Sequence, residues 1–67
     1  MNEYKVEFSW IQDRKRVKAR NWFPGDSAQE AAENCKAIFQ DLGLKEGQIE
    51  NVYRLTGYGW EICGNWN

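Results

Sequence analysis

The sequence predicts a small α+β domain with the element order ββαββ, or ββαβ, in which a small antiparallel sheet carries one amphipathic helix packed on one face. Three observations predict this fold. Apolar and polar residues alternate through two segments near the amino end, a capping motif then opens a stretch with helical periodicity, and the alternation returns after Gly43.

Strict alternation of apolar and polar residues predicts two strands, over residues 4–10 and 17–23, separated by the polar residues 12–15. So short a break suits a hairpin, although it lacks the Asn-Gly or Asp-Gly pair that favours a two-residue turn. The side chains expected to face the core are Tyr4, Val6, Phe8 and Trp10 from the first strand and Val17, Ala19 and Phe23 from the second.

The helix is predicted from its two ends. Ser27-Ala28-Gln29-Glu30 has the Ser-x-x-Glu form of a capping box, in which a hydroxyl and a carboxylate satisfy free backbone N–H groups. Gly43 suits the left-handed position that follows a helix, so the helix is expected to end near Leu42. Between these ends the apolar residues recur three and four apart, and they are Ala28, Ala31, Ala32, Cys35, Ile38, Phe39 and Leu42.

Alternation over residues 49–56 and 60–62 predicts the remaining strand or strands. Thr56-Gly57-Tyr58-Gly59 is typical of a turn, which makes residues 50–63 a hairpin; the alternative is one long strand bent at its glycines. The side chains expected in the core are Ile49, Asn51, Tyr53 and Leu55, followed by Trp60 and Ile62.

A single helix covers only one face of such a sheet, so a functional surface is expected on the other face. The side chains predicted to lie there are Lys5, Glu7, Ser9, Lys18, Arg20, Trp22, Val52, Arg54, Glu61 and Cys63.

The 67-residue chain has room for one domain, residues 1–67, with a thin hydrophobic core. A domain of this size buries only ~60 % of the surface that its unfolded chain exposes, so its four tryptophans, three tyrosines and three phenylalanines have to pack well. Because the core is small, association with a partner is expected to add to its stability.

Cysteine usage and hydropathy point to a reduced, cytoplasmic protein. Two cysteines do not form the framework of a disulfide-rich domain, and the amino end has no apolar run like that of a secretory signal. No apolar stretch approaches the ~20 residues that cross a bilayer, so no membrane association is expected.

The sequence contains no histidine, which removes the commonest general base and the most frequent metal ligand. Its aspartates and glutamates occupy predicted turns, caps and solvated faces. Cys35 and Cys63 lack the Cys-x-x-Cys spacing of zinc sites, and Gly57-Tyr58-Gly59 lacks the third glycine and the following helix of a dinucleotide-binding loop. We therefore expect no enzyme activity, no cofactor and no metal.

Positive charge is concentrated near the predicted hairpin. Residues 1–23 hold six basic and three acidic side chains, whereas residues 24–67 hold three basic and seven acidic ones, so a net charge of −1 conceals an electrostatic dipole. Basic residues beside an exposed aromatic ring suit single-stranded nucleic acid, although a pI of about 5.3 is low for such a protein. The candidate nucleic-acid-binding residues are Lys5, Arg14, Lys15, Arg16, Lys18, Arg20 and Trp22.

Trp22 and Trp66 are the aromatic residues that the predicted core accommodates least easily, so each is a candidate anchor for a partner. Tryptophan and arginine are enriched where proteins bind one another. The candidate partner-binding residues are Lys18, Arg20, Trp22 and Arg54.

The ten-residue run from Gly25 to Asn34, Gly-Asp-Ser-Ala-Gln-Glu-Ala-Ala-Glu-Asn, resembles the start of the helix in HicB-type antitoxins, where a similar stretch follows a short antiparallel sheet. The resemblance covers the capping box alone and transfers no function or site residue to this chain.

Taken together, these features predict a non-enzymatic small binding module that acts in protein–protein interaction or self-association through the uncovered sheet face and the basic hairpin, with a homodimer among the expected forms. The alternative is a single-stranded nucleic-acid-binding protein that uses the basic hairpin and Trp22.

Overall fold

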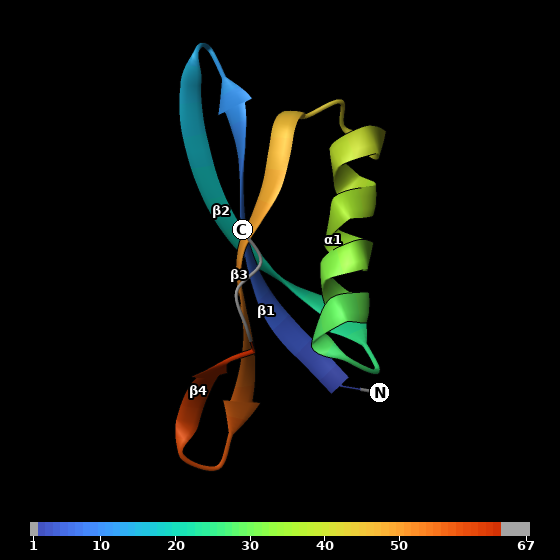
Figure 1. The fold of residues 1–67 in the computed structure, drawn as a ribbon, viewed down its shortest axis with the longest axis vertical. Coiled ribbons are helices and arrows are strands. Elements are labelled where there is room, and N and C mark those ends of the chain that lie inside the picture. Colours follow the sequence, from blue (N-terminus) through green and yellow to red (C-terminus); the bar gives the residue numbers. More distant parts are fainter. Residues whose placement is uncertain (1, 64–67) are drawn as a thin grey trace.

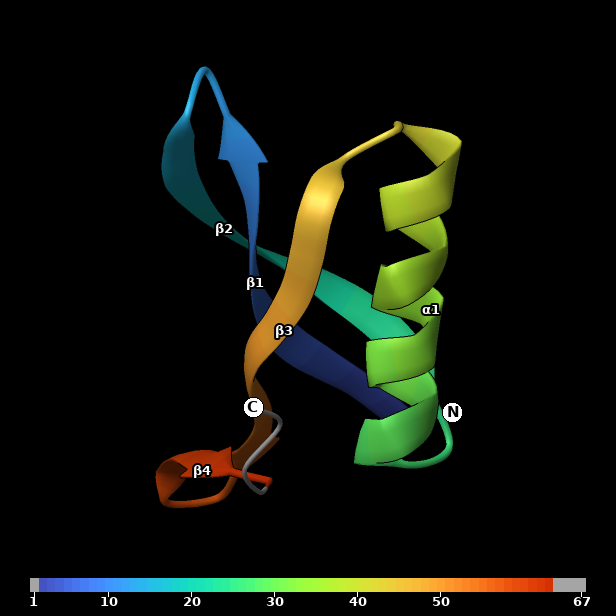
Figure 2. The ribbon, with the colours of Figure 1, turned by 45° about the horizontal axis from the view of Figure 1, so that its top comes forward.

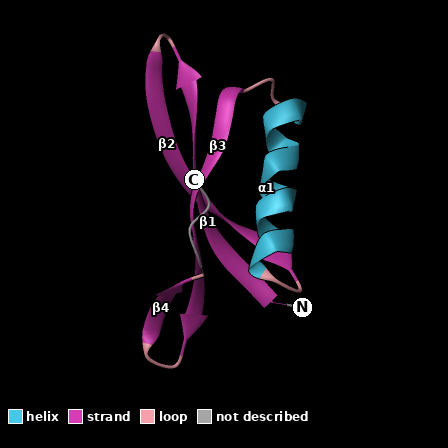
Figure 3. Cartoon of the chain, viewed as in Figure 1, coloured by secondary structure: helices cyan, strands magenta, loops and turns pink. Residues whose placement is uncertain are grey.

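The computed structural model describes residues 2–63 and confirms the predicted ββαββ order. Strands β1 (Asn2–Gln12) and β2 (Lys15–Gly25) precede helix α1 (Ala28–Asp41), and strands β3 (Lys45–Thr56) and β4 (Gly59–Ile62) follow it. The four strands form one antiparallel sheet in the order β2-β1-β3-β4, and α1 lies against one face of it (Figure 1 and Figure 3). Residues 50–63 therefore form a hairpin rather than one bent strand. Trp66 lies outside the described residues.

The β1–β2 hairpin has a regular register from Asn2↔Gly25 to Gln12↔Lys15. Its two-residue turn consists of Asp13 and Arg14, whose φ angles are 53° and 66°. Positive φ at both positions is typical of a type I′ turn, whose twist matches that of the flanking strands. The predicted hairpin thus forms without the favoured pair of turn residues, and Arg14 holds a backbone conformation that a side chain disfavours.

Replacing Arg14 by glycine is expected to stabilise the protein, because glycine adopts positive φ without the steric cost of a Cβ atom. The free energy of unfolding should rise by about 0.5–1 kcal/mol after allowance for glycine's greater freedom in the unfolded chain, and Tm by roughly 2–8 °C. Thermal unfolding followed by circular dichroism measures this. The matched control, Arg14→Ala, removes the same charge but keeps the Cβ; an equal gain in Tm for both variants would contradict the backbone explanation.

Both ends of the helix have the predicted caps. Ser27 Oγ accepts a hydrogen bond from the Glu30 N–H at 3.2 Å, while Glu30 Oε1 accepts one from the Asp26 N–H at 3.4 Å, one residue earlier than in a standard capping box. At the other end Gly43 has φ 64°, and the Leu44 N–H donates to the Phe39 carbonyl at 2.9 Å. This is the Schellman arrangement, and it turns the chain back along the sheet into β3.

The core lies between α1 and the covered face of the sheet. Alanines line the first half of the helix, which lets its backbone approach β2 closely: a Cβ atom on Gly25 would stand 2.8 Å from the Ala31 nitrogen. The buried apolar residues are Tyr4, Val6, Phe8, Phe23, Ala31, Ala32, Cys35, Ile49 and Val52.

A β-bulge in β3 overturns the predicted orientation of every later strand residue. Glu7 pairs with Asn51 but Phe8 pairs with Ile49, so Glu50 is an extra residue in β3. Side chains point to alternate faces of a strand, so one extra residue exchanges the faces of all that follow. Val52, predicted on the uncovered face, is fully buried in the core, whereas Leu55, predicted in the core, is 60 % exposed.

The side chains of the β3–β4 hairpin also lie on the opposite face from the one predicted. Tyr53 pairs with Ile62 and Leu55 pairs with Trp60, so all four side chains lie opposite the helix, contrary to the prediction for each of them. Asn51 is likewise outside the core, where it bonds Glu7. Glu61 lies beside Arg54 on the helix side, and Cys63, also predicted on the uncovered face, packs against the core instead.

Ser9 departs from the prediction in a different way. It lies on the uncovered face as expected, but its side chain is fully buried because the Arg16 guanidinium lies over it and donates a hydrogen bond to its Oγ at 2.9 Å. A second register shift, between Ser9 and Ile11, curves this end of β3, where Glu46 has φ 50°. Gly47 then leaves room for the Phe39 ring, 2.6 Å from where its Cβ would stand.

Candidate functional site: the open face of the sheet

The face of the sheet opposite α1, called the open face below, carries a pair of tryptophans that touch. Trp22 belongs to β2 and Trp60 to β4, which are the two edge strands of the sheet, and their ring centroids lie 5.1 Å apart at an interplanar angle of 45°. Two strands separate them, so the pair requires the sheet to curl toward its open face. Each indole remains about half exposed, at 44 % and 48 %.

The indole pair fixes β4, which the helix does not cover. Within residues 2–63, α1 contacts β1, β2 and β3 but makes no such contact with β4. Figure 1 and Figure 2 show β4 apart from the helix, at the opposite end of the sheet from the tip of the β1–β2 hairpin. Besides its pairing with β3, β4 is held by the Trp22–Trp60 contact and by Cys63, whose N–H donates to the Val52 carbonyl at 2.8 Å.

Lys5 lies beside the indole pair. It is the β1 partner of Trp22 on one side and of Tyr53 on the other, and its Nζ is 5.2 Å from the centre of the Trp60 ring. This is a cation–π geometry. Lys5, Arg20, Tyr53 and Trp60 together line an open hollow of about 210 Å³.

An apolar surface extends from this hollow over the β3–β4 hairpin. Leu55 and Ile62 are each 60 % exposed, and Tyr58 stands fully exposed at the tip of the hairpin turn. We call Trp22, Tyr53, Leu55, Trp60 and Ile62 the aromatic patch. Contiguous exposed apolar side chains of this kind mark interaction sites on small proteins, whereas single ones are ordinary.

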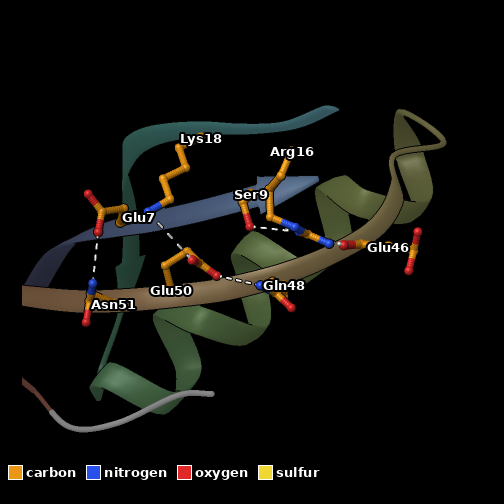
Figure 4. Close-up of polar contacts among 8 residues, drawn as sticks. All are labelled: Glu7, Ser9, Arg16, Lys18, Glu46, Gln48, Glu50 and Asn51. Carbon is orange, nitrogen blue, oxygen red and sulfur yellow. Dashed lines mark hydrogen bonds and ion pairs between the residues drawn. The ribbon is translucent and has the colours of Figure 1, made fainter. Parts of the chain in front are cut away.

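The other half of the open face is a polar network (Figure 4). Asn51 Nδ2 donates to Glu7 Oε1 at 2.8 Å, Gln48 Nε2 donates to Glu50 Oε2 at 2.8 Å, and Lys18 Nζ lies 4.0 Å from Glu50 Oε1. Arg16 completes it, since its Nη1 also donates to the Glu46 carbonyl at 3.2 Å. Each of these side chains thus already has at least one polar partner within the same chain.

The structure brings together three of the predicted site residues, Lys5, Arg20 and Trp22. Lys18 and Arg16 lie next to them in the polar network, while Arg14 and Lys15 stand at the hairpin tip, remote from the aromatic patch.

Arg54 requires a correction, because it does not lie on the open face. It is the β1 partner of Tyr4, a core residue, and its Nη2 contacts Glu61 Oε1 at 3.1 Å on the helix side of the sheet. The bulge at Glu50 moves Arg54 to that face, away from Arg20 and Trp22.

Sequence reasoning missed four members of the aromatic patch, Tyr53, Leu55, Trp60 and Ile62, because it placed them in the core. A signal for the bulge is present in the sequence: Ile49 and Val52 are three residues apart, with two polar residues between them, in a segment where alternation would space apolar residues by two. Had the break been placed there, all four would have been predicted to lie opposite the helix.

Neither thiol is activated as a nucleophile. Burial raises the pKa of Cys35 to about 12, and it also raises the pKa of Cys63, where Arg54 acts in the opposite direction and Glu61 in the same one. Both cysteines are free thiols. Residues 2–63 contain no group of three or more cysteine, aspartate or glutamate side chains that could hold a metal ion.

The two thiols should therefore react very differently with a reagent such as DTNB at pH 8. Cys63 is partly exposed and should be modified in the native protein, whereas Cys35 is buried, and a pKa of about 12 against the ordinary 9.0 makes its thiolate fraction about a thousandfold smaller. Absorbance should report one fast thiol, with the second appearing only in denaturant. Cys63→Ser should abolish the fast phase; two equally fast thiols in the native protein would contradict the buried position of Cys35.

Removing one indole should loosen β4 without unfolding the domain. In Trp60→Ala the Cys63 amide should exchange with solvent about twofold to tenfold faster, because an aromatic pair contributes about 0.5–1.5 kcal/mol beyond its buried area. Amides of β1 and β2 should keep their protection. Hydrogen exchange followed by NMR measures both, with Leu42→Ala, an exposed apolar residue at the helix end, as the control. Equal loss of protection throughout the chain would show that the pair belongs to the main core.

Comparison of the chain with models of known protein families, with curated protein sequences and with solved structures finds no significant match. Among the helices of the described part of the chain, none is long and apolar enough to cross a membrane.

Proposed function

We propose that this protein is a non-enzymatic binding module whose open face binds another protein or a second copy of itself. One observation carries the proposal: two half-exposed indoles in contact, at 5.1 Å, on the sheet face that the helix leaves uncovered. The two free thiols fit a reducing compartment, and on that ground we propose a cytoplasmic location.

The composition of the aromatic patch supports a protein partner. Tryptophan, tyrosine and arginine supply most of the large contributions at protein interfaces, and they do so where they cluster near the centre of a desolvated surface. Here Trp22, Trp60, Tyr53 and Arg20 lie together on an exposed surface, with the exposed aliphatic side chains of Leu55 and Ile62 beside them. Aliphatic side chains add apolar area that a protein partner can cover.

Binding of single-stranded nucleic acid is the second candidate. The observation that favours it is the hollow in which Lys5 and Arg20 adjoin the rings of Tyr53 and Trp60, since bases stack on aromatic rings while cations contact phosphates. Of the other cations of the predicted basic surface, Arg16 donates a hydrogen bond to Ser9 and Lys18 lies 4.0 Å from Glu50, and Glu7 is the direct β1 partner of Arg20. These contacts leave few cations for a phosphate backbone.

The proposal is tested by affinity capture from a lysate of the cells that express the protein, with bound proteins identified by mass spectrometry. Trp22→Ala should reduce capture of a specific partner about thirtyfold, because truncation of an interface hot spot costs about 2 kcal/mol or more of binding free energy. Leu42→Ala, which shortens an exposed apolar side chain elsewhere, should capture as the wild type does. Undiminished capture by Trp22→Ala and Trp60→Ala, both folded by circular dichroism, would remove the open face from consideration.

Self-association and nucleic-acid binding are separated by two further measurements on the same variants. Sedimentation velocity detects a dimer that dissociates in Trp22→Ala but not in Leu42→Ala. Fluorescence anisotropy with a labelled single-stranded oligonucleotide, at low and moderate salt, tests the second candidate, and an absence of binding at low ionic strength would exclude it.

A further inference from the structure

We propose that the hollow between Lys5, Arg20, Tyr53 and Trp60 receives a carboxylate from an acidic segment of a partner protein, whose neighbouring apolar side chains lie on Leu55 and Ile62. This inference rests on the proposed function and adds to it the chemical class of the partner. The segment it describes combines aspartate or glutamate with aliphatic or aromatic residues a few positions away.

The charge of the hollow supports this partner. Lys5 and Arg20 both line it, and among residues 2–63 no carboxylate does. Over residues 2–63, the ion pairs are Lys18–Glu50 and Arg54–Glu61, so within that range neither Lys5 nor Arg20 forms an ion pair, although Glu7 is the cross-strand neighbour of Arg20. Two cations that converge on one hollow beside low-dielectric ring surfaces favour an incoming anion.

The apolar side chains around the hollow favour an anion that belongs to an amphipathic segment. Tyr53 and Trp60 form its aromatic walls, and Leu55 and Ile62 lie next to them as the β3 and β4 neighbours in the register. A small anion alone would leave these side chains in water. A peptide that places an apolar side chain beside its carboxylate would cover both the hollow and the aliphatic surface.

A protein carboxylate fits this face better than a chain of phosphates. A nucleic acid needs a row of cations, but Arg16 donates to Ser9 and to the Glu46 carbonyl, and Lys18 lies against Glu50. The cations of the hairpin tip stand at the opposite end of the sheet from β4 (Figure 1). With Lys5 and Arg20 as its cations and Glu7 opposite Arg20, the hollow suits one or two negative charges rather than many.

The test is selection of a random peptide library, displayed on phage, against the wild-type protein. Selected peptides should be enriched in aspartate or glutamate close to leucine, isoleucine or aromatic residues. A resynthesised, labelled peptide should then bind about tenfold more weakly to Arg20→Glu, since that variant replaces an attraction by a repulsion, and more weakly at 0.5 M salt as well.

Two matched variants separate the local charge from other effects. Arg20→Lys retains the positive charge and should restore most of the affinity lost in Arg20→Glu. Lys36→Glu makes the same change in net charge on the helix, away from the open face, and should bind the peptide as the wild type does. Arg20 is exposed on an edge strand, so these variants should keep the native circular-dichroism spectrum.

The outcomes distinguish this inference from the function on which it rests. Peptides without acidic enrichment, bound equally by Arg20→Glu but lost in Trp60→Ala, would overturn the inference and leave protein binding by the aromatic patch in place. Selection of no peptide that depends on Trp22 or Trp60 would overturn both. Binding of an oligonucleotide more tightly than any peptide, with loss in Arg20→Glu, would overturn the inference in favour of nucleic acid.

Discussion

The structure depends on one extra residue in β3. If Glu50 were paired regularly instead of bulged, strict alternation would place either Ile49 or Val52 on the solvent side of the sheet, and burial of such a side chain is worth about 1.5–3 kcal/mol. The bulge lets both residues face α1, where they are 3 % and 0 % exposed. The same extra residue turns Trp60 and Ile62 to the open face. One irregularity in the backbone therefore completes a small core and creates the surface that we propose binds a partner.

The two faces of the sheet are stabilised differently, as expected for a domain with one helix and four strands. The helix covers β2, β1 and β3 and leaves β4 to be held by contacts on the other side. The Trp22–Trp60 pair supplies such a contact, and it joins the two edge strands across β1 and β3. Half of each indole stays exposed. A partner that covered these rings would also secure the part of the sheet that lies farthest from the core.

Features set by neighbouring residues could be predicted from the sequence, whereas features set by residues far apart in the chain could not. The capping residues Ser27 and Glu30, the left-handed Gly43 and the alternation of β1 act over a few residues, and each predicted its element correctly. The bulge depends on how β3 aligns with β1, more than forty residues earlier in the chain. Alternation was therefore continued through Glu50, which placed Tyr53, Leu55, Trp60 and Ile62 on the wrong face and brought Arg54 into the predicted site. Trp22, Lys5 and Arg20 were placed correctly because they precede the bulge.

The strand pairing also alters how the cluster of basic residues is interpreted. The sequence shows a cluster of cations around the first hairpin, and by count alone that cluster resembles a surface for phosphates. In the folded chain Arg16 covers Ser9, Lys18 lies against Glu50, and Arg54 is on the other face with Glu61. The cations that remain beside the aromatic rings are Lys5 and Arg20. Two cations next to an apolar surface favour a carboxylate with apolar side chains close to it. A protein segment offers both groups, whereas a phosphate backbone offers only the negative charge. The number of basic residues is thus a weaker guide to the partner than which of them form no ion pair within residues 2–63.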